Sequence, residues 1–167
     1  MSQQPYAGEK ARLYYFLKNA IEAAAENTPF YQAQLRYTHF EYTKEEEYGI
    51  CLSNTVGQPG CGPADEYREF NVRIIVTAYC RIPSAERDER IEADAKAYLL
   101  AMAVAKLIDE QPDLGTGSVG CLNSSRIGKL IGDVDDTLAA GQKHAVYNLY
   151  VTINHDGRPL PEPWDMN

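Results

Sequence analysis

The sequence predicts an α+β fold, in which a single mostly antiparallel sheet has two helices packed on one face. Two segments have the apolar spacing of helices, and five have the alternation or apolar content of strands. Their order is α-β-β-β-α-β-β. Because runs of strands separate the helices, this order favours α+β over the repeated β-α-β units of a parallel sheet.

The chain of 167 residues is long enough for one domain with its own core. Apolar residues make up 44% and charged residues 24%, a balance that excludes a disordered chain. The longest nearly apolar run, residues 97–107, falls far short of the ~20 residues that span a bilayer. We expect one domain over residues 1–155, a Pro-rich C-terminal extension over residues 156–167, and synthesis in the cytoplasm without a secretory leader.

The first predicted helix spans residues 9–26. Leu13, Phe16 and Leu17 lie on one broad face with Ile21. The helix should end at Asn27-Thr28-Pro29, because the residue before a proline disfavours the helical region.

Residues 35–53 predict a β-hairpin, since side chains alternate on both sides of an acidic turn at Glu45, Glu46 and Glu47. The following stretch, residues 53–66, is rich in Gly and Pro. It predicts a long loop and a candidate contact surface.

Residues 69–81 give the clearest strand prediction. One face is apolar and should point to the core; it comprises Phe70, Val72, Ile74, Val76, Ala78 and Cys80. The other face mixes Ile75, Tyr79 and two arginines, so the sheet should have a second, partly apolar face.

The second predicted helix spans residues 85–110, with Ser84 as the expected N-cap and Pro112 as the stop. One apolar stripe is expected to pack on the sheet; it comprises Ile91, Ala95, Tyr98, Met102 and Ala105, widened by Leu99 and Leu107.

Two further strands are predicted at residues 119–131 and 143–154. The connection between them, residues 132–142, contains Asp133, Asp135 and Asp136 and is expected to be a polar loop.

No pattern in the sequence predicts a catalytic residue, a cofactor or a metal site. The stretch GTGSVG at residues 115–120 follows a helix and lacks the Lys-Ser/Thr ending of a phosphate loop, which favours a simple turn. The four cysteines form no close pair, and the DVDD stretch lacks the glycine and glutamate of a calcium loop. His144 and Cys121 have the chemistry of a nucleophile pair, but nothing in the sequence brings them together.

The net charge of −8 argues against non-specific binding to duplex nucleic acid and against docking on anionic lipid. The composition is also unusual in its 12 tyrosines. Tyrosine is enriched both in protein interfaces and in ordinary strands, and both interpretations stay open. The candidate interface residues are Tyr42, Tyr48, Cys61, Tyr79, Tyr150 and Trp164.

The order of elements resembles a known family. A long strand runs through Pro83-Ser84 into a long helix, FNVRIIVTAYCRIPSAERDERIEADAKAYLLAMAVAKLIDEQPDLG, which ends in a D-x-x-P-D-L-G turn at Asp109–Gly115. The final strand, AVYNLYVTINHD, follows a weaker one. Over residues 10–155 this resembles the tail terminator proteins of long-tailed bacteriophages, also called tail-completion or head–tail joining proteins.

The resemblance implies a virion structural protein without enzymatic activity, assembled in the host cytoplasm. Its subunits would form a homo-hexameric ring that caps the tail tube and meets the head–tail connector. DNA would pass through the channel without specific binding, which suits an acidic subunit. The candidate lumen-facing carboxylates are Glu45, Glu46, Glu47, Asp133, Asp135 and Asp136.

Three alternatives stay open at this point. They are another connector or tail-tube component of a virion, a small cytosolic α+β enzyme or ligand-binding domain, and a regulatory binding module. A concave site with convergent polar groups would favour an enzyme, and large flat interfaces would favour a ring subunit.

Overall fold

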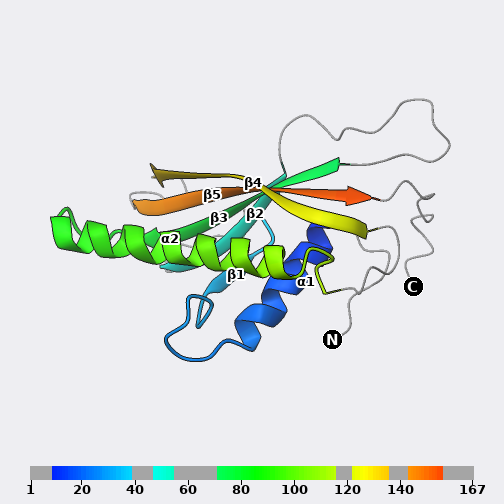
Figure 1. Cartoon of the computed structure of the whole chain (residues 1–167). Coiled ribbons are helices and arrows are strands. Elements are labelled where there is room, and N and C mark those ends of the chain that lie inside the picture. Colours follow the sequence, from blue (N-terminus) through cyan, green and yellow to red (C-terminus); the bar gives the residue numbers. More distant parts are fainter. Residues whose placement is uncertain (1–8, 39–46, 55–70, 116–121, 136–142, 156–167) are drawn as a thin grey trace.

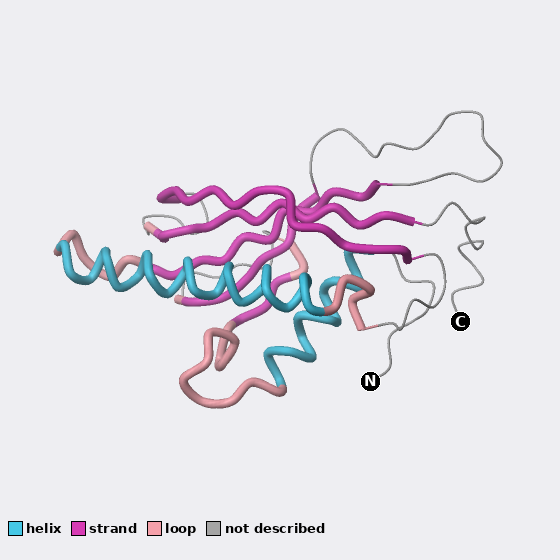
Figure 2. Tube along the Cα trace, viewed as in Figure 1, coloured by secondary structure: helices cyan, strands magenta, loops and turns pink. Residues whose placement is uncertain are grey.

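A computed structural model describes residues 9–38, 47–54, 71–115, 122–135 and 143–155. The helices are α1 (Glu9–Glu22) and α2 (Arg87–Glu110). The strands are β1 (Gln34–Arg36), β2 (Tyr48–Asn54), β3 (Asn71–Arg81), β4 (Leu122–Asp135) and β5 (His144–His155). These strands form one sheet in the order β1-β2-β3-β5-β4, and both helices lie on one side of it (Figures 1 and 2). The predicted α+β class and element order are confirmed.

The pairing of β1 corrects the predicted hairpin. Among the described residues around the predicted first arm, Gln34–Arg36 pair with β2, and they run parallel to it, with Leu35 opposite Ile50. The other neighbouring strands are all antiparallel. Side-chain alternation identifies a strand but says nothing about the direction of its partner, and a parallel pair cannot be joined by a tight turn.

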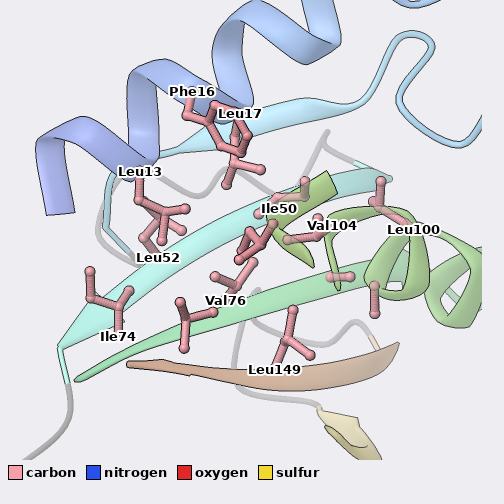
Figure 3. Close-up of a cluster of buried hydrophobic side chains, with 14 of the residues drawn as sticks. Leu13, Phe16, Leu17, Ile50, Leu52, Ile74, Val76, Leu100, Val104 and Leu149 are labelled. Atoms are coloured by element: carbon pink, nitrogen blue, oxygen red, sulfur yellow. The ribbon is translucent and has the colours of Figure 1, made fainter. Parts of the chain in front are cut away.

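The core lies between the sheet and the two helices (Figure 3). α1 contributes Leu13, Phe16 and Leu17, as its spacing predicts. The sheet contributes the predicted face of β3 together with every second residue of β2 and β5; those in the core are Ile50, Leu52, Ile74, Val76, Ala78, Leu149, Val151 and Ile153. α1 stops at Glu22, four residues before the predicted end.

The predicted packing stripe of α2 is wrong for Ile91, Ala95, Tyr98, Leu99 and Met102, which are exposed, whereas Ala105 and Leu107 do pack against the core. The helix buries a different face, made of Ala93, Ala97, Leu100, Ala101, Val104 and Ile108. Its alanines lie over the part of the sheet where Tyr48 and Tyr147 stand beside Ala145. Because the interior is close-packed, large side chains on the sheet leave room only for small side chains on the helix, and the alanine-rich face therefore packs on the sheet.

The ends of α2 also differ in detail from the prediction. The N-cap is Glu86 rather than Ser84, because the Ser84 hydroxyl accepts from the Glu86 N–H at 3.1 Å and donates to the Glu89 carboxylate. At the other end, Leu114 and Gly115 both have left-handed φ angles, of 54° and 74°. Leu114 is nevertheless part of the core, so the turn that ends α2 is anchored by a buried side chain.

β4 is longer than predicted and reaches Asp135, which pairs with His144. Asp133 and Asp135 therefore lie on a strand rather than in the expected polar loop. Backbone pairing with β5 continues along this edge despite the polar side chains, because an edge strand needs only one partner.

Candidate assembly surface

The outward face of α2 bears four exposed apolar side chains, which we call the α2 stripe. The exposed fractions are 59% for Ile91, 42% for Tyr98, 54% for Leu99 and 41% for Met102. Their spacing places them along one side of the helix. They belong to the set that the sequence pattern assigned to the core. Their exposure makes α2 apolar on two opposite sides, and clustered exposed apolar residues mark interaction surfaces.

Tyr98 is held in place by contacts with the sheet. Its ring packs edge-on against Tyr147, with ring centroids 5.4 Å apart. The Tyr147 hydroxyl donates a hydrogen bond to the Asp94 carboxylate at 2.9 Å. Burial, followed by this hydrogen bond, raises the pKa of Tyr147. The stripe is thus built on a fixed helix surface rather than on a loop.

A groove of about 730 Å³, which we call the Tyr48 groove, runs beside the first half of α2. One wall is the connection after α1, residues 27–32, and the other is α2 from Glu89 to Leu99. The start of β2 and the end of β3 form its base through Tyr48, Cys80 and Arg81. Leu99 therefore belongs both to the α2 stripe and to the groove.

Tyr48 connects the base of the groove to its wall through a hydrogen bond. Its hydroxyl donates a hydrogen bond to the Pro29 carbonyl. Burial raises the pKa of Tyr48 to about 12, with a smaller contribution from Cys80. Burial likewise raises the pKa of the Cys80 thiol, so that thiol is protonated and a weak nucleophile at neutral pH.

Charges of both signs surround the groove. Arg81 and Glu47 form an ion pair at 2.7 Å, and Lys96 lies 3.2 Å from Glu92. These pairs are solvent-exposed and so add little stability. The groove therefore combines charged and polar side chains with aromatic and apolar ones.

On the sheet face away from the helices, the side chains are buried at one end and partly exposed at the other. Tyr79, Cys51 and Val146 form a buried cluster, and the His144 ring meets the Tyr79 ring edge-on with centroids 5.8 Å apart. Further along, Ile75 and Tyr150 are directly paired and half-buried. The second partly apolar face that the sequence predicts is therefore present only at its Ile75–Tyr150 end.

The structure separates the candidate interface residues. Tyr48 lies in the groove on the helix side of the sheet, and Tyr150 lies on the opposite side. Tyr79 is completely buried, so its side chain lies inside the subunit. Tyr42, Cys61 and Trp164 lie outside the described residues.

Of the candidate carboxylates, Glu47 is exposed and paired with Arg81 at the groove. Asp133 and Asp135 are placed only by their backbone on β4. Glu45, Glu46 and Asp136 lie outside the described residues, as does most of the predicted Gly/Pro-rich loop. The sequence pattern does not identify the α2 stripe as a surface, because it assigns these apolar residues to the core. The available signal was the second, alanine-rich stripe on the same helix.

Within the described ranges, His, Cys, Asp and Glu side chains form no group of three that could hold a metal ion. Cys51 and Cys80 are buried free thiols. No helix in the described part of the chain has the length and apolar character needed to cross a membrane.

The fold and its surfaces define a two-layer α+β domain with an apolar helix face and a groove beside it. No family model and no curated protein matches the sequence. Among solved structures, the chain is similar to one in the virion of a native gene transfer agent (GTA) particle. The TM-score is 0.55 at 11% sequence identity, and the match covers 92% of this chain and 99% of the other. At that identity the likeness shows a common fold.

Proposed function

We propose that this chain is a structural subunit of a phage-like virion, and within it a ring-forming tail terminator or neck subunit. Its partners would be further copies of itself in a hexameric ring, the tail-tube protein and the head–tail connector. The ring would cap the tube and join tail to head, with no enzymatic step. DNA would slide through the channel without specific binding.

The observation that carries this proposal is the α2 stripe. A closed ring of identical subunits needs two different patches on each subunit, one for each neighbour. The α2 stripe is one apolar patch, and the Ile75–Tyr150 end of the other sheet face is a second, on the opposite side of the sheet. The fold shared with a GTA virion chain over nearly its whole length supports a place in a virion.

The net charge of −8 is consistent with a DNA channel. Phosphate binding requires Lys and Arg in register with the backbone, and an acidic wall repels the duplex instead. Passage of DNA then proceeds without a tightly bound state.

Native mass spectrometry and light scattering across protein concentrations test the proposal, with negative-stain images of the particles. We expect a discrete hexamer, formed alone or on added tail tubes. Ile91→Lys and Met102→Lys should abolish it, because each places a charge in the stripe. Gln111→Lys makes the same change of charge at an exposed position beyond the stripe and should assemble normally. A chain that stays monomeric both alone and with tail tubes would contradict the proposal.

A further inference from the structure

The outward side of α2 repeats with the spacing of a coiled-coil seam. Ile91, Ala95, Tyr98, Met102 and Ala105 are alternately four and three residues apart, which is the a and d spacing of a heptad. The first four are exposed and Ala105 is partly buried. The residues that the helix buries against the sheet all fall at other heptad positions. The helix therefore has a second, regular seam on its solvent side.

The seam is self-complementary when a second copy of α2 lies against it in the antiparallel direction. With the two helices centred on one another near Leu100, Tyr98 lies opposite Met102 of the second copy, and Ala95 lies opposite Ala105. Each layer then joins an a position to a d position, as knobs-into-holes packing requires. The thioether of Met102 meets an aromatic ring, and the paired alanines let the two helices approach closely.

The charges beside the seam match in the same register. On one flank, in the e positions, stand Glu92, Leu99 and Lys106, all exposed. In an antiparallel pair the e positions of the two helices face each other. Glu92 of each copy then meets Lys106 of the other, and Leu99 meets Leu99 at the centre. Within the subunit, Glu92 and Lys106 pair only with Lys96 and Glu110 one turn away, at 3.2 Å and 4.0 Å on the exposed surface.

The other flank of the seam decides against a parallel pair. A parallel pair places the e positions of one helix beside the g positions of its partner. Two of the g positions are Ala101 and Ile108, which are buried against the subunit's own sheet. Only the flank with Glu92, Leu99 and Lys106 is fully available, and two copies of that flank meet only when the helices run in opposite directions.

The contact is small. At each end of the seam, Ile91 would lie opposite Asp109, an exposed carboxylate, so the apolar contact is confined to the middle of the helix. Stable interfaces bury roughly 1,200–2,000 Å² in total. One exposed side of a single helix from each copy falls at the low end of this range. The pair should therefore be reversible, with a dissociation constant on the order of 10 μM.

We propose that α2 pairs with α2 of a second copy in the antiparallel direction, so that free subunits form a dimer about a two-fold axis beside Leu99. Such a contact is isologous and closes at two copies, whereas a ring needs two different patches on each subunit. The dimer covers the α2 stripe, and subunits must separate before that stripe can meet a ring neighbour. The pairing stands independently of the proposed function, but this consequence for the ring rests on it.

A cysteine at the two-fold axis tests the geometry in the purified full-length protein without tail tubes. Leu99→Cys should form a covalent dimer when oxidised glutathione is added, with position 99 linked to position 99 in a mass map. Gln111→Cys is the matched control, because it is also exposed but its two copies would lie roughly 33 Å apart along the helices. Wild-type protein treated in the same way accounts for the native cysteines.

Charge reversal tests the register without a covalent bond. Glu92→Lys places a lysine opposite Lys106 of the other copy, and the two-fold axis repeats this repulsion. We expect the dissociation constant in sedimentation equilibrium to rise about tenfold. Lys106→Glu should weaken the dimer similarly, and the two substitutions combined should restore the wild-type affinity. Glu22→Lys makes the same change of charge on an exposed position of α1 and should leave the affinity unchanged. Circular dichroism of each variant verifies that the subunit is folded.

The outcomes separate this inference from the proposed function. A strict monomer at all concentrations would overturn the inference, as would a hexamer that forms without any dimer. A folded double variant that fails to recover the dimer, or no excess linkage of Leu99→Cys over Gln111→Cys, would overturn it even if the chain forms rings on tail tubes. A chain that dimerises as described but never forms a ring with tail tubes would support the pairing and contradict the proposed function.

Discussion

The hydroxyl oxygen of Tyr79 stands over Gly49, so near that a Cβ on that glycine would lie 2.8 Å from it. The two residues are directly opposite each other in the β2–β3 pair. The same Cβ would also be 2.4 Å from the Gln34 carbonyl oxygen. The absence of a side chain at Gly49 thus lets the Tyr79 ring and β1 approach β2 together.

Gly49→Ala should therefore destabilise the fold. Because one of the clashing atoms belongs to the backbone, side-chain movement alone cannot relieve the overlap. We expect a loss of about 1–3 kcal/mol in the free energy of unfolding, measured by denaturant titration. Ser53→Ala, on the same strand and the same face, should change it by less than about 0.5 kcal/mol. A fully stable Gly49→Ala protein would contradict this packing.

Aspartate substitutions should impair mainly folding at Tyr79 and mainly assembly at Tyr150. Tyr79 is completely buried, so Tyr79→Asp places a charge in the interior and should cost about 3 kcal/mol or more in folding. Tyr150 is half-buried beside Ile75, so Tyr150→Asp should cost only about 1 kcal/mol while impairing assembly. Thermal unfolding at low protein concentration and native mass measure the two effects separately. Equal losses of folding stability in both variants would contradict the distinction.

Tyr48 should make stability depend on alkaline pH. Its pKa is raised from 10.0 to about 12 in the folded state. Between these values the unfolded chain releases the proton first, so the stabilising contribution is complete below pH 10 and is lost as the pH rises toward 12. Tyr48→Phe should reduce this decline in unfolding free energy.

The control for that titration is Tyr150→Phe, which removes a hydroxyl on the other face and leaves Tyr48 in place. It should retain the decline due to Tyr48. If the unfolding free energy of Tyr48→Phe declines with rising pH as steeply as that of the wild type, Tyr48 does not account for the pH dependence.

Leu114 should be essential to the turn that ends α2. It is buried in the core although its φ angle of 54° is unfavourable for a leucine. Leu114→Ala should cost about 2–5 kcal/mol of unfolding free energy, because it empties a packed site without relieving the backbone. Leu99→Ala removes the same atoms from an exposed position and should change monomer stability by less than about 0.5 kcal/mol. Similar losses of unfolding free energy in Leu114→Ala and Leu99→Ala would contradict the placement of Leu114 in the core.

Local patterns along the chain predict the class of fold, the order of the elements and the core face of most strands. These features follow from local periodicity. Once one face of the sheet is buried, the alternation along β3 and β5 specifies which side chains point to the core. The helical face of Leu13, Phe16 and Leu17 was determined in the same way. The Asp109–Gly115 turn is also predictable from the sequence, because proline and glycine restrict or permit backbone conformations locally.

Local patterns do not predict the direction of β1, the length of β4 or the side of α2 that faces the sheet. Each depends on a partner distant in the sequence. α2 has two apolar sides, and periodicity ranks them almost equally. The side with Ala93, Ala97 and Ala101 packs on the sheet because Tyr48 and Tyr147 already occupy space there. The other side therefore stays exposed and forms the candidate assembly surface of Ile91, Tyr98, Leu99 and Met102.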